Sequence, residues 1–231
     1  YLQDLVQKHR AHVGFAFDGD GDRVLAINPE GHIKEGDDLL ALLLTHPRFS
    51  AAPTLVGTSM SNEGLANHVR TLGKTFIRTS VGDKYVMATL KQLKLPLGGE
   101  PSGHILFPEL MPGADGMATA LLVAHAIVLT KTYHLTTFTP FAQTTIDLPC
   151  TTKHDLTKGI YARILEDVTS QLGAGRCVVR YSGTEPVLRI MVEHPEQHKA
   201  VSFAQQLAEQ LRPHLTVHTQ SMENLHAIPA L

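Results

Sequence analysis

The sequence predicts an α/β protein with more than one domain, and three observations support this. With 231 residues, 43% hydrophobic and 18% charged, the chain can form one large or two smaller cores. Strand-like and helix-like segments alternate through its middle, which is typical of an α/β layer with a largely parallel sheet. Two adjacent strand-like segments with flanking helices follow, which favours a smaller α+β domain with an antiparallel sheet covered on one face.

The first 34 residues are predicted to form a helix and two strands. Within residues 1–9 the apolar residues recur at helical spacing. Strand-like runs at 13–18 and 22–28 then flank a glycine-rich loop. A turn at 29–31 precedes a helix that begins near 39, with Asp37 or Asp38 as its expected N-cap. We place the first domain boundary near residue 34.

A middle α/β unit is predicted over 35–136, and a smaller α+β unit over 141–220. The middle unit contains strands at 54–58, 75–79 and 97–99 and helices at 62–72, 83–93 and 115–130. A polar segment with a proline, 136–140, reads as the linker. The second unit contains strands at 143–148, 176–181 and 187–193 and helices at 156–172 and 196–211. The last residues, 221–231, have no strong pattern and are expected to be loose.

Composition excludes several classes of function. A net charge of −2 and a pI near 6.7 argue against nucleic acid and anionic membranes as partners. No apolar run approaches the roughly 20 residues of a membrane helix. Two cysteines, Cys150 and Cys177, have neither metal-ligand spacing nor a disulfide framework, which favours the cytoplasm. The chain starts without methionine and within a helical pattern, so we expect a fragment of a longer protein.

The loop at 18–23 has the composition of a metal site. It places Asp18, Asp20 and Asp22 on alternate positions, separated by glycines and followed by Arg23. Three carboxylates this close repel one another, and hard oxygen ligands suit Mg²⁺ or Ca²⁺. An EF-hand would need glycine at the sixth position and glutamate at the twelfth, where Arg23 and Pro29 stand. A solvated acidic turn is the remaining alternative.

Two further loops carry polar groups on glycine-containing turns. The segment 98–104 combines Glu100, Ser102 and His104, a set that suits sugar hydroxyls. The segment 180–189 can hold a phosphate, because arginine and hydroxyl groups donate to it and glycine lets backbone N–H groups converge. Its candidate residues are Arg180, Ser182, Gly183, Thr184 and Arg189. An ordinary turn with incidental polar groups is the alternative for both loops.

These three motifs, in this order, resemble the α-D-phosphohexomutase superfamily across nearly the whole chain. Residues 18–23 are similar to the metal-binding loop of the family. Residues 99–104 are similar to its sugar-recognition loop, Gly-Glu-x-Ser-Gly-His, and residues 180–186 to its phosphate loop, Arg-x-Ser-Gly-Thr-Glu-Pro. Segments 56–65 and 81–86 resemble its phosphoglucosamine mutase branch most. By this resemblance, 1–34 ends the metal-binding second domain, 35–136 is the sugar-recognition third domain and 141–220 is the phosphate-binding fourth.

The resemblance implies a Mg²⁺-dependent isomerase that interconverts glucosamine 6-phosphate and glucosamine 1-phosphate through a phosphoserine and a bisphosphate. Under it, the three aspartates bind Mg²⁺, and Arg23 faces the substrate or the transferring phosphate. The 100–104 residues recognise the sugar, and the 180–189 residues anchor the other phosphate. The implied partners are the phosphosugar, the missing N-terminal domains and a second copy in a homodimer. The implied setting is amino-sugar and cell-wall precursor synthesis.

The chain departs from the family pattern at two places. No Thr-Ala-Ser-His-Asn-Pro-like loop with the nucleophilic serine is present, and neither Ser59 nor Ser61 is nominated for that role. Ser80 stands where many mutases carry lysine, so Arg78 or Lys84 is expected nearby instead. The chain alone is therefore predicted to be inactive. The alternatives are phosphomannomutase/phosphoglucomutase activity in the parent, or a non-catalytic sugar-phosphate-binding module.

Overall fold

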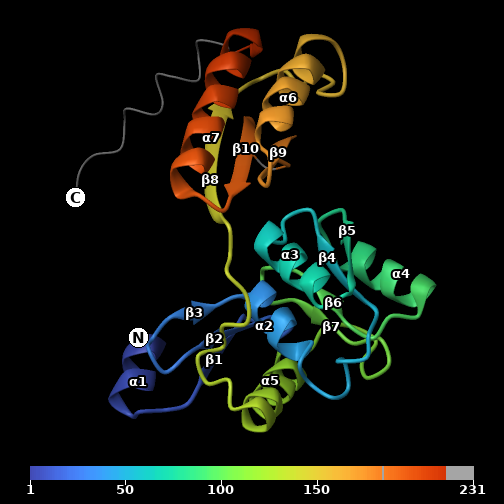
Figure 1. Ribbon diagram of the computed structural model, residues 1–231, viewed down its shortest axis with the longest axis vertical. Coiled ribbons are helices and arrows are strands. Elements are labelled where there is room, and N and C mark those ends of the chain that lie inside the picture. The colour runs from blue at the N-terminus through green and yellow to red at the C-terminus, as the bar shows by residue number, and fades with distance from the viewer. Residues whose placement is uncertain (184, 217–231) are drawn as a thin grey trace. The chain divides into compact units, whose positions relative to one another are not determined.

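The computed structural model describes residues 1–183 and 185–216, and the chain divides into two compact units, Tyr1–Pro140 and Phe141–Leu231 (Figure 1). Both pieces expected within 1–136 therefore lie in the first unit. The expected loose tail at 221–231 lies outside the described residues.

The first unit begins with a small antiparallel sheet in the order β1-β2-β3. Helix α1 (Leu2–Lys8) precedes strands β1 (Gly14–Phe17), β2 (Val24–Ile27) and β3 (Ile33–Lys34). Phe17 pairs with Val24, so the aspartate loop closes a hairpin between β1 and β2. The predicted helix and two strands are confirmed. Strand β3 was not predicted, because two residues are too few to show a periodicity.

The second sheet of this unit has the order β5-β4-β6-β7. Its strands are β4 (Thr54–Thr58), β5 (Thr75–Thr79), β6 (Gly98–Gly99) and β7 (Ile105–Leu106). Strand β4 runs parallel to β5 and β6, which confirms the predicted parallel layer. Strand β7 adds an antiparallel edge, so the sugar loop is the connection between β6 and β7.

Helices cover both faces of this sheet. Since neighbouring residues of a strand point to opposite sides, each strand contributes side chains to the core on either face. They are α2 (Gly36–Leu43), α3 (Glu63–Thr71), α4 (Asp83–Leu93) and α5 (Gly116–Thr130). Val56 packs with Val86 and Leu90 of α4. Leu55 packs on the other side, in the large core that α2, α3 and α5 share. Figure 1 shows α4 lying apart from α2 and α5.

The start of α2 differs from the sequence-based prediction. Its N-cap is Glu35, and neither Asp37 nor Asp38 takes that role. Glu35 accepts from the backbone of Asp38, and the Asp38 carboxylate accepts in return from the Glu35 N–H at 3.2 Å, a capping box. Asp37 turns inward, where its Oδ2 accepts from the Asn62 N–H at 2.6 Å. The prediction was wrong because this partner lies 25 residues away.

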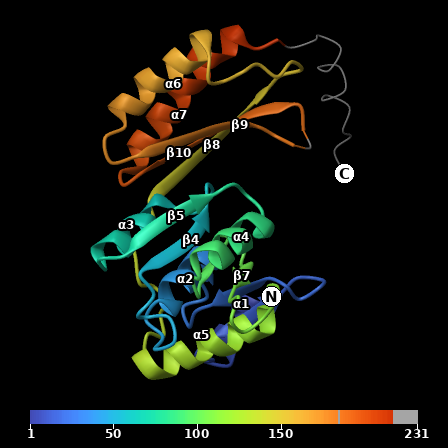
Figure 2. The same cartoon turned by 90° about the vertical axis from the view of Figure 1, so that its right-hand side faces the viewer.

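The second unit is an antiparallel sheet in the order β8-β10-β9 with helices on one face, as predicted (Figures 1 and 2). Its elements are β8 (Ala142–Pro149), α6 (Gly159–Gln171), β9 (Arg176–Tyr181), β10 (Val187–His194), α7 (Gln197–Leu211) and a 3₁₀ turn at Arg212–His214. Leu188, Ile190 and Val192 point into the core beneath α6 and α7. Arg189, between two of them, therefore lies on the opposite face.

The structure bears on the two cysteines and on the length of the apolar helices. Cys150 is buried and Cys177 half-buried, and both are free thiols. No helix in the described part of the chain combines the length and the hydropathy that a membrane span requires.

Candidate functional site: an aspartate hairpin beside a sugar-binding loop

The aspartate hairpin gathers its three carboxylates. One oxygen from each of Asp18, Asp20 and Asp22 lies within 4.8 Å of the other two, a spacing that a single cation can bridge. The Arg23 N–H donates to Asp18 Oδ1 at 3.2 Å, and Arg23 Nε lies 3.7 Å from Asp18 Oδ2. The turn therefore holds the carboxylates together with one arginine at its end.

The electrostatics of the hairpin favour a cation. Burial raises the pKa of Asp22, and the charges of Asp20 and Asp18 raise it further against the opposing effect of His104. Burial acts to raise the pKa of Asp18 as well, but hydrogen bonds from the Arg23 backbone and with Asp22 hold it below its ordinary value. Asp22 Oδ1 is buried and has no hydrogen-bond partner among the described residues. A hard divalent cation would satisfy that oxygen and relieve the repulsion.

The sugar loop lies beside this hairpin in the same unit. His104 is buried, and its Nδ1 lies 3.6 Å from Asp22 Oδ2. Glu100 is also buried, and its Oε1 accepts from the Gly82 N–H at 2.9 Å. Glu100 Oε2 has no hydrogen-bond partner in the described part of the chain. One carboxylate oxygen is therefore fixed, and the other remains available to a ligand.

Two hollows in the surface join the hairpin to the sugar loop, and Arg23 and Ser102 line both of them. The first, of about 280 Å³, also touches Asp18. The second, of about 290 Å³, also touches Glu100. Its remaining lining residues are Thr58, Met60, Val81 and Pro101. The structure thus brings together the predicted metal, catalytic and sugar-binding residues of the first unit.

Three residues that line the second hollow or hold Glu100 in place were not predicted from the sequence to be functional. Gly82, which the sequence did not single out as a functional residue, donates its N–H to Glu100 Oε1 and fixes that carboxylate. Gly82 has a φ of +126°, which glycine adopts readily and other residues rarely do, so the glycine itself was the only sign of its role in the sequence. Met60 and Val81 are apolar residues within segments 56–65 and 81–86, and no local pattern in the sequence placed them at the hollow.

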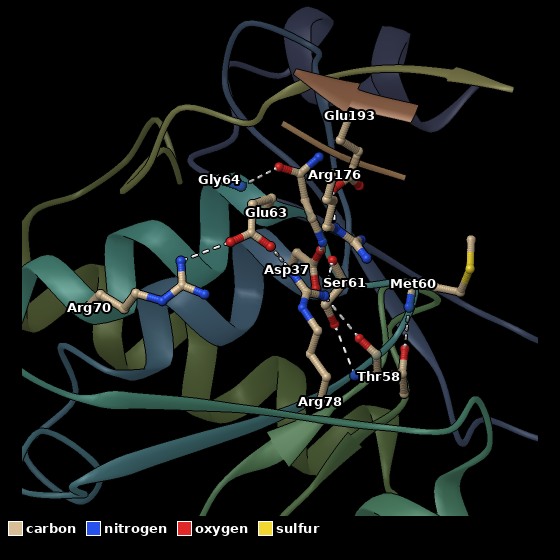
Figure 3. Close-up of polar contacts among 11 residues, drawn as sticks. Asp37, Thr58, Met60, Ser61, Glu63, Gly64, Arg70, Arg78, Arg176 and Glu193 are labelled. Atoms are coloured by element: carbon tan, nitrogen blue, oxygen red, sulfur yellow. Dashed lines mark hydrogen bonds and ion pairs between the residues drawn. The ribbon is translucent and has the colours of Figure 1, made fainter. Parts of the chain in front are cut away.

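Polar contacts hold the turn after β4 in place, as Figure 3 shows. Ser61 is fully buried, and its Oγ accepts from the Thr58 N–H at 3.2 Å. Arg78 donates to the carbonyl oxygens of Thr58, at 3.1 Å, and Ser61, and it pairs with Glu63 at 2.7 Å. Arg78 thus ties this turn to α3, and nothing here supports it as a substitute for a phosphate-binding lysine.

The other expected substitute at that position is Lys84. Its ammonium group lies 4.9 Å from the centre of the Tyr85 ring, and the residue is exposed at the start of α4. Ser80 is exposed as well. Lys84 therefore remains a prediction for this role.

The predicted phosphate loop lies in the second unit, between β9 and β10. The Ser182 Oγ accepts from the Glu185 N–H at 3.1 Å, and the Ser182 N–H donates to the Val187 carbonyl at 3.0 Å. Gly183 is exposed and has open space where a Cβ would stand. Lys153, which the sequence did not single out, donates to the Ser182 carbonyl at 3.3 Å. Thr184 lies outside the described residues.

The two predicted arginines of this loop differ in their environment. Arg189 lies between Asp147 and Arg180 across the three strands. Its guanidinium binds Asp147 at 2.8 and 2.6 Å and Glu185 at 3.2 Å. The hydrogen bond from Arg189 lowers the pKa of Asp147. Arg180 has no hydrogen bond or ion pair with a described residue, so its guanidinium donors are less engaged than those of Arg189.

Comparison with known proteins identifies the family. Residues 35–139 match "Phosphoglucomutase/phosphomannomutase, alpha/beta/alpha domain III", and residues 158–210 match "Phosphoglucomutase/phosphomannomutase, C-terminal domain". The chain belongs to this family. Its phosphohexomutase domains III and IV are the mixed α/β layer and the antiparallel unit described above.

Curated relatives are phosphoglucosamine mutases from bacteria. The one from Pseudoalteromonas translucida (strain TAC 125) is 39% identical over 215 residues, which are 90% of this chain and 48% of the relative. The one from Nitrosococcus oceani (strain ATCC 19707) is 39% identical over 223 residues, 93% of this chain and 49% of the relative. The chain thus spans about half the length of the curated relatives it matches.

Solved phosphohexomutases share the fold. N-acetylphosphoglucosamine mutase of Aspergillus fumigatus, in complex with GlcNAc-6P and magnesium, has a TM-score of 0.68 at 18% identity, covering 91% of this chain and 56% of that one. A phosphoglucomutase/phosphomannomutase family protein from Burkholderia thailandensis has a TM-score of 0.68 at 22% identity, covering 90% and 48%. Sugar phosphate and magnesium are thus present in a solved relative.

Proposed function

We propose that this chain provides the metal-binding, sugar-recognition and phosphate-anchoring parts of a phosphoglucosamine mutase. The reaction interconverts glucosamine 6-phosphate and glucosamine 1-phosphate by way of a phosphoserine and a sugar bisphosphate. The observation that carries the proposal is the three-aspartate cluster within 4.8 Å, beside a hollow shared by Arg23, Glu100 and Ser102. The similarity to bacterial phosphoglucosamine mutases supports the choice of sugar.

The metal site consists of Asp18, Asp20 and Asp22. The three carboxylates fit Mg²⁺, which prefers hard oxygen ligands and leaves positions for phosphate. The buried Oδ1 of Asp22, which has no hydrogen bond with a described residue and only an ion pair with Arg23 at 3.9 Å, is one of the available ligands. Bound there, Mg²⁺ supplies charge neutralisation to a phosphoryl group. Arg23 orients the same phosphoryl group, since a guanidinium offers forked donors to phosphate oxygens.

The other residues hold the two ends of the substrate. Glu100, Ser102 and His104 accept from and donate to the sugar hydroxyls in either orientation of the ring. In the second unit, the loop at 180–189 binds the phosphate that is not reacting. Arg180 is its main donor, and Ser182, Gly183, Thr184 and Arg189 complete the loop. The nucleophilic serine belongs to a segment that this sequence does not contain, so the chain binds without turnover.

Isothermal titration of the full chain with phosphosugars in Mg²⁺ buffer tests this function. We expect glucosamine 6-phosphate to bind about tenfold more tightly than glucose 6-phosphate or mannose 6-phosphate, because its ammonium group is attracted to Glu100. Ser102→Ala should weaken all three ligands, while Ser170→Ala, on the exposed surface of α6, should weaken none. Tighter binding of mannose 6-phosphate, or turnover by the chain alone in a coupled assay, would contradict the proposal.

A further inference from the structure

Two glycines from distant parts of the sequence lie directly against the backbone of the metal hairpin. The Gly116 N–H, at the start of α5, donates to the Gly21 carbonyl at 2.9 Å. The Gly103 carbonyl, in the sugar loop, accepts from the Val24 N–H at 3.2 Å. The hairpin is therefore attached on one side to a helix and on the other to the loop that carries the sugar-binding residues.

Neither glycine position has room for a side chain. A Cβ on Gly116 would lie 2.7 Å from the Arg23 carbonyl oxygen and 2.8 Å from that of Gly21. A Cβ on Gly103 would lie 2.1 Å from the Val24 carbonyl oxygen. All three neighbours are backbone atoms, so the clash cannot be relieved by turning a flexible side chain. Any larger residue must displace the hairpin itself.

The elements behind these glycines have little freedom to move away. Helix α5 is anchored through Val123 and Ala126, which are fully buried, and its N-cap Asp115 accepts from the Ala118 N–H at 2.8 Å. The sugar loop is closed by the Gly103 N–H donating to the Glu100 carbonyl at 3.1 Å. A larger residue at Gly103 or Gly116 must therefore move the hairpin and the sugar loop together.

We infer that Gly103 and Gly116 are positioning residues that join the metal hairpin and the sugar loop into one rigid backbone assembly. The metal ligands and the sugar-binding residues are then preorganised together, and a disturbance at α5 reaches both. This inference rests on the proposed function for its biological meaning. Its physical content, mechanical coupling of the two loops, does not need the metal.

Hydrogen exchange of the metal-free chain tests the coupling, with Gly116→Ala compared against Gly113→Ala. Gly116 has no positive φ, so alanine there tests only the lack of space, and Gly113 has nothing within 4 Å of its Cβ position. We expect Gly116→Ala to speed exchange of the Val24 and Gly103 amides about tenfold each, since both report local opening. Gly113→Ala should leave both amides unchanged.

Faster exchange confined to the hairpin, with the Gly103 amide unchanged, would overturn the inference. If Gly116→Ala does not fold, hydrogen exchange of the wild-type chain tests whether the hairpin and the sugar loop are coupled. Adding Mg²⁺ should then slow exchange of the Gly103 amide along with that of Val24, and slowing at Val24 alone would overturn the coupling. A wild-type chain that binds no Mg²⁺ by titration would contradict the proposed metal site but not the coupling, which the metal-free comparison decides whenever Gly116→Ala folds.

Discussion

Replacing Asp20 by asparagine should weaken Mg²⁺ binding by roughly a hundredfold or more, since one of three anionic ligands is lost while the shape is kept. The variant should stay folded, because Asp20 is exposed at the tip of the hairpin. In the absence of metal it should be at least as stable as the wild type, because repulsion with Asp18 and Asp22 is removed. Titration calorimetry with Mg²⁺ and thermal melting with and without Mg²⁺ measure both effects.

The matched control is Asp167→Asn, an exposed carboxylate on α6 of the second unit. It changes the net charge by the same amount and should leave Mg²⁺ affinity unaltered. Equal Mg²⁺ affinities for Asp20→Asn and the wild type would mean that the aspartate hairpin is an acidic turn without a metal role.

Phe107→Ala should lower the stability of the first unit by about 3–5 kcal/mol. Phe107 is 1% exposed and stacks on Phe49 with ring centres 5.5 Å apart, in the large core of the first unit. Loss of the ring leaves a cavity that the surrounding helices cannot fill without moving. Hydrogen exchange of the most protected amides in each unit measures the loss separately for the two units.

Phe17→Ala is the control for this substitution, because Phe17 is 40% exposed. It should cost less than about 1 kcal/mol, the usual range for surface positions. The amides of β10, in the second unit, should be unaffected by either substitution. Loss of protection in β10 as large as that in β4 would show that the two units do not unfold independently.

Periodicity predicted most elements of the fold, because long helices and buried strands expose their pattern directly. The helix at 115–130 and the strand at 187–193 match α5 and β10 to within one residue. The prediction failed where partners lie far away in sequence. Asp37 turned inward to meet Asn62, which left the N-cap to Glu35. The two-residue strands β3 and β7 were missed because they exist only through pairing with a neighbour.

The chemical groups of the candidate site could be predicted from the sequence, but the contacts between its loops could not. The alternate aspartates of 18–23 indicated a metal, and the structure places their oxygens together. Nothing in the sequence placed His104 3.6 Å from Asp22, or directed the Gly82 N–H to Glu100. Similarly, the pairing of Arg189 with Asp147 spans 42 residues and depends on strand register. Such contacts follow from tertiary packing, which local patterns do not encode.

The most direct test of the central claim, that the aspartate hairpin and the sugar loop form one metal-dependent site, is NMR of the histidine rings during titration with paramagnetic Mn²⁺. Because His104 Nδ1 lies 3.6 Å from Oδ2 of the Asp22 carboxylate, a proposed metal ligand, the His104 ring signals should broaden at stoichiometric Mn²⁺. They should recover when excess Mg²⁺ displaces the Mn²⁺. The broadening should be absent in Asp20→Asn. Unchanged His104 signals while Mn²⁺ binds elsewhere on the chain would contradict the claim.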